Sequence, residues 1–186
     1  MEHRIEIPLT REKAAAIKSG DLVYLSGVIY TARDAAHKRM IDIIDNGGEL
    51  PFPLNDSVIY YVGPTPEEPG CVIGSAGPTT SYRMDAYAPT LLALGLRGMI
   101  GKGKRSQEVI EAMKSAGAVY FGAIGGAAAL LADCIKESSI IAFDDLGTEA
   151  IRRLVVKDFP VTAVIDSYGE NLYIEGREAY LASLNG

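Results

Sequence analysis

The chain has few residues with which it could hold a metal by itself. Its 186 residues include only two cysteines and two histidines, and neither cysteine belongs to a Cys-x-x-Cys pair. Cys71 lies in a strand-like apolar run and Cys134 in a helix-like run, which predicts two buried thiols. This set does not make a structural zinc site or a complete iron–sulfur site.

Long apolar runs and excess positive charge are also lacking. The apolar runs are about strand length, and none approaches the roughly 20 residues that a membrane span needs. Residues 1–7 are charged and lack the apolar core of a signal peptide, so we expect a cytoplasmic protein. The formal net charge of −6 argues against a general nucleic-acid binder. No Gly-x-Ser-x-Gly, Walker or His-Glu-x-x-His motif is present.

Strand and helix patterns alternate along the middle of the chain. Strands are predicted over residues 5–9, 22–30, 58–63, 71–75, 98–101, 118–124 and 139–143, followed by a hairpin over 161–174. Helices are predicted over residues 10–18, 34–45, 85–94, 106–115, 127–136 and 177–184. Such alternation predicts an α/β fold with a mixed, largely parallel sheet flanked by helices, in one domain over residues 1–186.

Individual residues mark the boundaries of these elements. Thr10, Asp34 and Ser106 are the predicted N-caps of three helices, and Gly117 is expected to close the third. The run 22–30 is broken at Gly27, which indicates either two paired strands or one strand with a bulge.

The segment 77–85, Gly-Pro-Thr-Thr-Ser-Tyr-Arg-Met-Asp, predicts an anion site. The Gly-Pro pair makes a turn, three hydroxyl residues follow, and Arg83 comes four residues after Thr79. Hydroxyls and a guanidinium fork suit a carboxylate or a phosphate. A helix opening at Arg83 would add free N–H groups to the same site.

Three basic residues follow predicted strands and stand next to glycine, proline or a helix start: Arg33, Arg83 and Lys102. In parallel sheets, ligands gather at the loops that leave the carboxyl ends of the strands. Three cations around a polar centre would suit a dicarboxylate, although each could equally be a solvated surface charge. Lys104 and Arg105 are expected to be surface charges or phosphate-type contacts.

Two further features have more than one interpretation. His37 lies one helical turn beyond Arg33, so it is either a half-buried helix histidine or a proton-transfer group. The glycines of 122–126 follow a strand and precede a helix, but their Gly-x-x-Gly-Gly spacing is not the dinucleotide fingerprint. Close helix–strand packing explains them more simply than nucleotide binding.

Taken together, four motifs resemble those of the class I (iron–sulfur) fumarate hydratases. They are Thr-Ala-Arg-Asp-Ala-Ala-His-Lys-Arg at 31–39, the segment 77–85, Gly-Lys-Gly-Lys-Arg-Ser at 101–106 and Gly-Ala-Ile-Gly-Gly-Ala at 122–127. The chain is similar to the β subunit of these enzymes, or to the C-terminal domain of the single-chain forms. The L(+)-tartrate dehydratase β subunit belongs to the same group. Tyr82 and Lys104 depart from the family pattern, which leaves fumarate and tartrate open as substrates.

The resemblance implies a swivelling β/β/α fold and an active site shared between two subunits. A partner α subunit would carry a [4Fe-4S] cluster, whose open iron acts as a Lewis acid. The assembly would be a hetero-oligomer, with a homodimer as the form of the isolated chain, and it would have no nucleic-acid or membrane partner.

The implied reaction is the reversible hydration of fumarate to (S)-malate. By this resemblance Arg33, Arg83 and Lys102 would hold the carboxylates of the substrate. Thr79 would stand near the C3 proton and would need activation by a partner carboxylate or a neighbouring cation. His37 is a second candidate for proton transfer. The alternatives are a tartrate dehydratase β subunit, which would convert tartrate to oxaloacetate, and a non-catalytic dicarboxylate-binding module.

Overall fold

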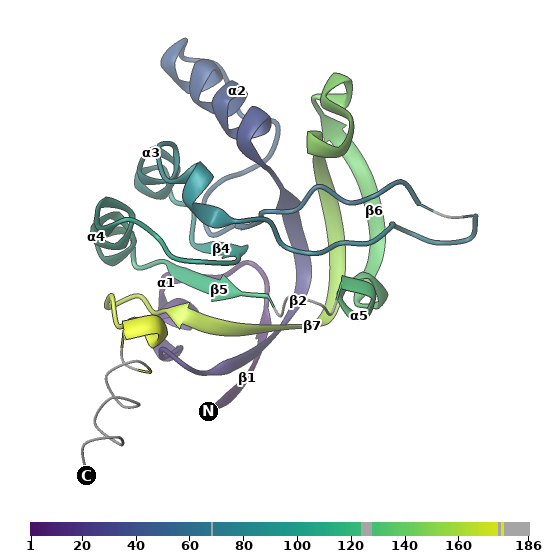
Figure 1. Cartoon of the computed structure of the whole chain (residues 1–186). Coiled ribbons are helices and arrows are strands. Elements are labelled where there is room, and N and C mark those ends of the chain that lie inside the picture. The colour runs from purple at the N-terminus through teal and green to yellow at the C-terminus, as the bar shows by residue number, and fades with distance from the viewer. Residues whose placement is uncertain (68, 124–127, 175, 177–186) are drawn as a thin grey trace.

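The protein is described by a computed structural model over residues 1–67, 69–123, 128–174 and 176 (Figure 1). Within these residues, five neighbouring strands run parallel in chain order: β1 (Glu2–Glu6), β2 (Leu22–Thr31), β3 (Val58–Tyr60), β4 (Gly98–Gly101) and β5 (Val119–Gly122). Strands β6 (Ile135–Ala142) and β7 (Ile151–Ile165) are antiparallel to their neighbours. The predicted α/β fold with a mixed, largely parallel sheet is confirmed.

Strand β7 closes the sheet on itself, which the sequence did not predict. It pairs with β5 and also with β2, so β2, β3, β4, β5 and β7 form a closed, barrel-like ring. The predicted hairpin over 161–174 is wrong, because residues 161–165 are the end of a 15-residue strand. Asn171 joins that strand only through an isolated bridge to Ile165.

The helices lie on defined faces of this sheet (Figure 1). They are α1 (Arg11–Ala16), α2 (Asp34–Asp45), α3 (Ala88–Ala93), α4 (Gln107–Ala116) and α5 (Ala128–Asp133), with 3₁₀ turns η1 (Ser81–Met84) and η2 (Asp144–Glu149). Helices α2, α3 and α4 share an apolar cluster with one face of the sheet, whereas α1 and α5 contribute to the cluster on the other face. None of the helices in the described residues is long and apolar enough to cross a membrane.

Alternation along the strands separates the two apolar clusters. Tyr60 and Phe121 belong to the cluster that the closed sheet surrounds, whereas Ile59 and Tyr120 belong to the cluster beneath α2, α3 and α4. Successive side chains of a strand point to opposite faces. Both faces of β3, β4 and β5 are therefore buried, which explains why their sequences are apolar without alternation.

Three of the four predicted cap residues are confirmed. The hydroxyls of Thr10 and Ser106 each accept a hydrogen bond from the N–H three residues ahead, and Gly117 ends α4 in the left-handed region at φ 68°. Strand β2 is continuous with an irregularity between Leu25 and Gly27, which favours the second of the two alternatives, one strand with a bulge. Asp34 is not the N-cap of α2 but its first helical residue.

Two predicted strands are wrong. The first lies at Glu2–Glu6, three residues earlier than predicted, since Pro8 has no N–H for a sheet hydrogen bond. Residues 71–75 form no strand, and two glycines, Gly70 and Gly74, flank or interrupt that run. The glycines at 125–126 and the predicted helix over 177–184 lie outside the described residues.

Residues 64–67 and 69–76 instead belong to a long excursion that follows β3 and extends across β6 (Figure 1). A groove of about 590 Å³ lies between this excursion and the α5–β6 segment, and it contains none of the predicted site residues. Cys71 is exposed on the excursion and Cys134 is half-buried, so the prediction of two buried thiols is wrong for Cys71.

Candidate active site

Residues 79–81 lie between the carboxyl ends of β3 and β4. The Thr79 N–H donates to the carbonyl oxygen of Tyr61 (2.7 Å), and the Ser81 N–H donates to the carbonyl oxygen of Lys102 (2.9 Å). The Lys102 N–H in turn donates to the carbonyl oxygen of Thr79 (3.3 Å). Two segments that the sequence singled out are thus joined side by side, at the edge where ligands of parallel sheets gather.

Arg33 and Arg83 share one carboxylate. The Asp34 Oδ2 lies 3.2 Å from Nη2 of Arg83 and 3.7 Å from Nη2 of Arg33. Arg83 Nη2 also donates to the hydroxyl oxygen of Thr79 (2.9 Å). A carboxylate therefore fits within reach of both guanidiniums, and the Thr79 hydroxyl lies against one of them.

The environment of Lys102 differs from that of the two arginines. Its side chain is exposed, and its backbone bridges to Thr80. The structure thus brings the backbone of Lys102 to Thr79 and Thr80, and leaves the ammonium group in solvent. Four of the five predicted site residues therefore belong to one polar region: Arg33, Thr79, Arg83 and Lys102.

Glu149 holds Arg33 in place and was missed by the sequence analysis. Its Oε1 lies 3.3 Å from Nη2 of Arg33, and its Oε2 accepts the N–H of Ala35 (3.0 Å) in the first turn of α2. The N-cap Arg33 has no side-chain cap bond of its own, so Glu149 satisfies a helix N–H that would otherwise lack a partner. A Cβ atom at Gly63 would lie 2.8 Å from Nη1 of Arg33, so a glycine there makes room for the guanidinium.

His37, the fifth predicted residue, is fully buried behind this region, with 0% of its surface exposed. Its Nδ1–H donates to the carbonyl oxygen of Arg33 (2.9 Å), and the rings of Tyr61 and Tyr87 pack around it. Because its partner is a carbonyl, which only accepts, the proton of the neutral ring lies on Nδ1. Burial lowers the pKa of His37 to about 4, so the ring is neutral near pH 7.

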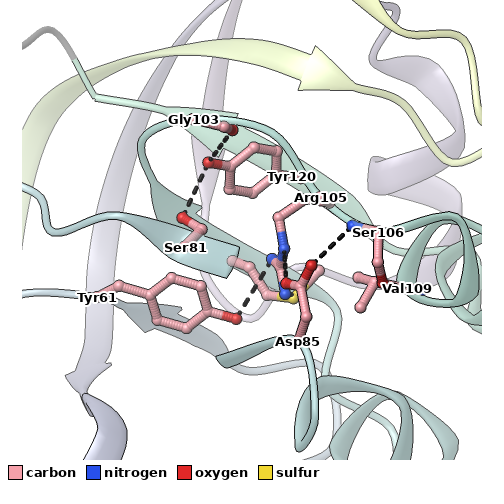
Figure 2. Close-up of polar contacts among 9 residues, drawn as sticks. Tyr61, Ser81, Asp85, Gly103, Arg105, Ser106, Val109 and Tyr120 are labelled. Atoms are coloured by element: carbon pink, nitrogen blue, oxygen red, sulfur yellow. Dashed lines mark hydrogen bonds and ion pairs between the residues drawn. The ribbon is translucent and has the colours of Figure 1, made fainter. Parts of the chain in front are cut away.

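Arg105 is buried rather than a surface charge, so that prediction is wrong. Its Nε donates to Oδ1 of Asp85 (2.7 Å; Figure 2). Its guanidinium carbon lies 5.4 Å from the ring centre of Tyr61 and 5.1 Å from that of Tyr120. Burial disfavours the charged form of Arg105, but Tyr61, Asp85 and Tyr120 outweigh it and raise its pKa. Lys104 is exposed, as expected.

The glycines of the fourth motif give no sign of a nucleotide site within the described residues. Gly122 is the last residue of β5, and a Cβ atom there would lie 2.8 Å from Cγ2 of Val164 on β7. Close packing therefore accounts for this glycine. Residues 124–127 lie outside the described part of the chain. A contact between a ligand and the helix N-terminus at these residues is therefore not tested by the structure.

No group of three or more His, Cys, Asp or Glu side chains lies together as metal ligands in the described residues. Polar groups at the carboxyl ends of β2, β3 and β4 of the closed mixed sheet thus gather in one region, where the carboxylate of Asp34 lies within reach of two guanidiniums.

The chain belongs to the family described as "Fumarase C-terminus", whose model matches residues 2–176. It is 39% identical over 183 residues to a Methanocaldococcus jannaschii protein provisionally named L(+)-tartrate dehydratase subunit beta, which covers 95% of this chain and 94% of that protein. It is 40% identical over 169 residues to "Fumarate hydratase 2" of Leishmania major, covering 90% of this chain. It is also 42% identical over 151 residues to "Fumarate hydratase class I, aerobic" of Escherichia coli, covering 80% of this chain.

The lengths covered in these relatives differ. The chain spans only 30% of the Leishmania protein and 28% of the Escherichia coli protein, but nearly all of the archaeal subunit. Its relatives are thus named as hydro-lyases or as a subunit of one, which confirms the family that the four motifs indicated.

Proposed function

We propose that this chain is the β subunit of a two-subunit hydro-lyase that reversibly hydrates fumarate to (S)-malate. The observation that carries the proposal is that Arg33 and Arg83 share the carboxylate of Asp34, and that Arg83 also donates to the Thr79 hydroxyl. A substrate carboxylate would compete with Asp34 for the same two guanidiniums, with each charge-assisted hydrogen bond contributing about 1.5–3 kcal/mol. Lys102, on the adjoining segment, would bind the second carboxylate.

Thr79 is the proton-transfer group in this proposal. A neutral threonine hydroxyl is a weak base, and it acts only when its alkoxide form is stabilised. The guanidinium of Arg83 contacts the Thr79 oxygen at 2.9 Å, and a cation at that distance favours the ionised form. The full burial of His37 favours a structural role for that residue, in which its ring holds the backbone of Arg33.

The cluster and the partner subunit also belong to the proposal. The described residues of this chain do not fit a [4Fe-4S] cluster, since no three ligands lie together and Cys71 and Cys134 occupy exposed and half-buried positions. An iron–sulfur α subunit would therefore supply the Lewis acid. The roles left to this chain are to bind the carboxylates and to hold the proton-transfer group, within a swivelling β/β/α domain of a hetero-oligomer.

A second candidate is the β subunit of an L(+)-tartrate dehydratase. The observation in its favour is the archaeal relative with that name, which matches this chain over nearly the whole length of both proteins. Tartrate is also a four-carbon dicarboxylate and differs from malate by one hydroxyl, so the same arginines would bind it.

Assembly with a cysteine-bearing α subunit under anaerobic iron–sulfur reconstitution tests both candidates. We expect the complex to interconvert malate and fumarate, while a Thr79→Val complex binds substrate but does not turn it over. Turnover of tartrate alone would favour the second candidate. A chain that binds dicarboxylates yet stays inactive with every such subunit would overturn both, and would favour a non-catalytic binding module.

A further inference from the structure

Three of the predicted site residues of this chain lie on two segments that are well apart in the sequence. Thr79 and Arg83 belong to the turn that leads into η1, whereas Lys102 follows β4. A ligand with two carboxylates needs its two cationic partners at a constant separation. The contacts that hold the two segments together therefore determine how far apart the two cations lie. Figure 2 shows these contacts.

Asp85 links the two segments with both of its carboxylate oxygens. Its Oδ1 accepts from Nε of Arg105 (2.7 Å), and its Oδ2 accepts from the backbone N–H of Ser106 (2.7 Å). The Arg105 side chain is 0% exposed and that of Asp85 is 12% exposed. Buried, two-pronged contacts of this kind hold one geometry, because water does not compete for them. Asp85 lies two residues after Arg83, and Arg105 lies three residues after Lys102.

Tyr120 makes a second link between the two segments. Its hydroxyl donates to the carbonyl oxygen of Gly103 (3.0 Å) and lies 2.9 Å from Oγ of Ser81. Since the single phenolic proton goes to Gly103, the Ser81 hydroxyl is the donor of the other bond. Gly101 permits this approach, because a Cβ atom there would lie 2.0 Å from the Ser81 Oγ.

We propose that Asp85 and Arg105 are positioning residues that set the separation between Arg83 and Lys102, and so select ligands with two carboxylates over ligands with one. This inference rests on the proposed function, because it assumes that those two cations bind the substrate. Neither residue needs to touch the ligand. Their effect is on the distance between two groups that do, and misplacement by about 1 Å is enough to cost about 100-fold in rate at an enzyme site.

The test compares two probes of matched shape on the full chain. Succinate carries two carboxylates, and butyrate replaces one of them with a methyl group. Dissociation constants are measured by two-dimensional NMR titration for the wild type, Asp85→Asn and Arg105→Lys. The control is Glu111→Gln, which removes an exposed ion pair with Lys114 on α4 and should leave both constants unchanged.

We expect Asp85→Asn and Arg105→Lys to weaken succinate binding by about tenfold or more, as expected for loss of one well-placed charged contact, and to change butyrate binding by less than about twofold. Equal losses for both probes would overturn the inference, because a general loss of structure weakens the binding of succinate and butyrate alike. No loss for either probe would overturn it as well. Tyr120→Phe removes the second link without altering charge, and it should lower the succinate preference even if an ion-pair variant fails to fold. If the wild type binds neither probe, the proposed dicarboxylate site fails, and this inference fails with it.

Discussion

The stability of this protein should fall between neutral and mildly acidic pH because of one residue, His37. Burial holds its pKa at about 4 in the native state, whereas a histidine in an unfolded chain has a pKa of about 6.5. As the pH falls below about 6.5, the unfolded chain takes up a proton that the native state refuses, and the free energy of unfolding decreases. Arg105 adds to the depression, while the Arg33 carbonyl and Asp34 oppose it.

The size of the effect follows from the difference in pKa. A shift of about 2.5 units corresponds to about 3 kcal/mol when the linkage is complete, at about 1.36 kcal/mol per unit. Between about pH 7.5 and about pH 5, roughly 2 kcal/mol of this is lost. With a urea slope of about 2 kcal/mol per molar, the unfolding midpoint falls by about 1 M over that range. Asp21, whose pKa a hydrogen bond from the N-terminal amine lowers to about 2, titrates below this window.

Urea unfolding followed by circular dichroism, at several pH values between these limits, measures the effect. His37→Gln removes the titrating ring while keeping a side-chain amide near the Arg33 carbonyl, so this variant should lose the pH slope whatever its absolute stability. An NMR titration of the ring protons gives the native pKa directly. A midpoint near 6.5, or a slope that persists in the glutamine variant, would contradict the assignment of a buried, neutral His37.

Three further predictions concern the site and its supports. Arg83→Ala should lower kcat/KM of the assembled enzyme roughly ten- to several-hundred-fold, given about 1.5–3 kcal/mol per charged contact, and unchanged kinetics would remove Arg83 from the site. Glu149→Gln retains an oxygen for the α2 N–H but loses the charge beside Arg33, so KM should rise while the melting temperature changes little; a large loss of stability with normal KM would refute this role. Gly101→Ala places a methyl group 2.0 Å from the Ser81 hydroxyl, and it should destabilise the fold by about 1–3 kcal/mol. Gly176→Ala, where nothing lies within 4 Å and φ is outside the left-handed region, is the control without a steric clash in a denaturant titration.

The sequence predicted the local features well because neighbouring residues determine them. The N-caps at Thr10 and Ser106, the left-handed Gly117 and the bulge beside Gly27 depend on hydrogen bonds or backbone conformations within a few residues. Where a local signal stood alone, it misled. The apolar run after Gly70 has the residues of a strand, but it forms none.

The sequence also grouped most residues of the candidate site, but it did not predict all of the contacts that support them. Arg33, Arg83, Thr79 and Lys102 could be grouped from their positions after strands and from their motifs. Glu149 could not, since it lies 114 residues from the helix N-terminus that it contacts. Arg105 looked like one more surface charge within a basic run, and only its burial against Asp85 shows otherwise.

By itself, then, the sequence determined the alternation of strands and helices, the family, and the residue types offered to a carboxylate, because propensity and motif spacing are properties of short segments. The tertiary structure decided how those segments meet. Closure of the sheet by β7, the placement of residues 79–81 between the ends of β3 and β4, and the burial of His37 and Arg105 all depend on contacts between residues far apart in the chain. Packing and desolvation arise only when distant segments share one core, and they determine which charges are free to bind a ligand and which are held in place.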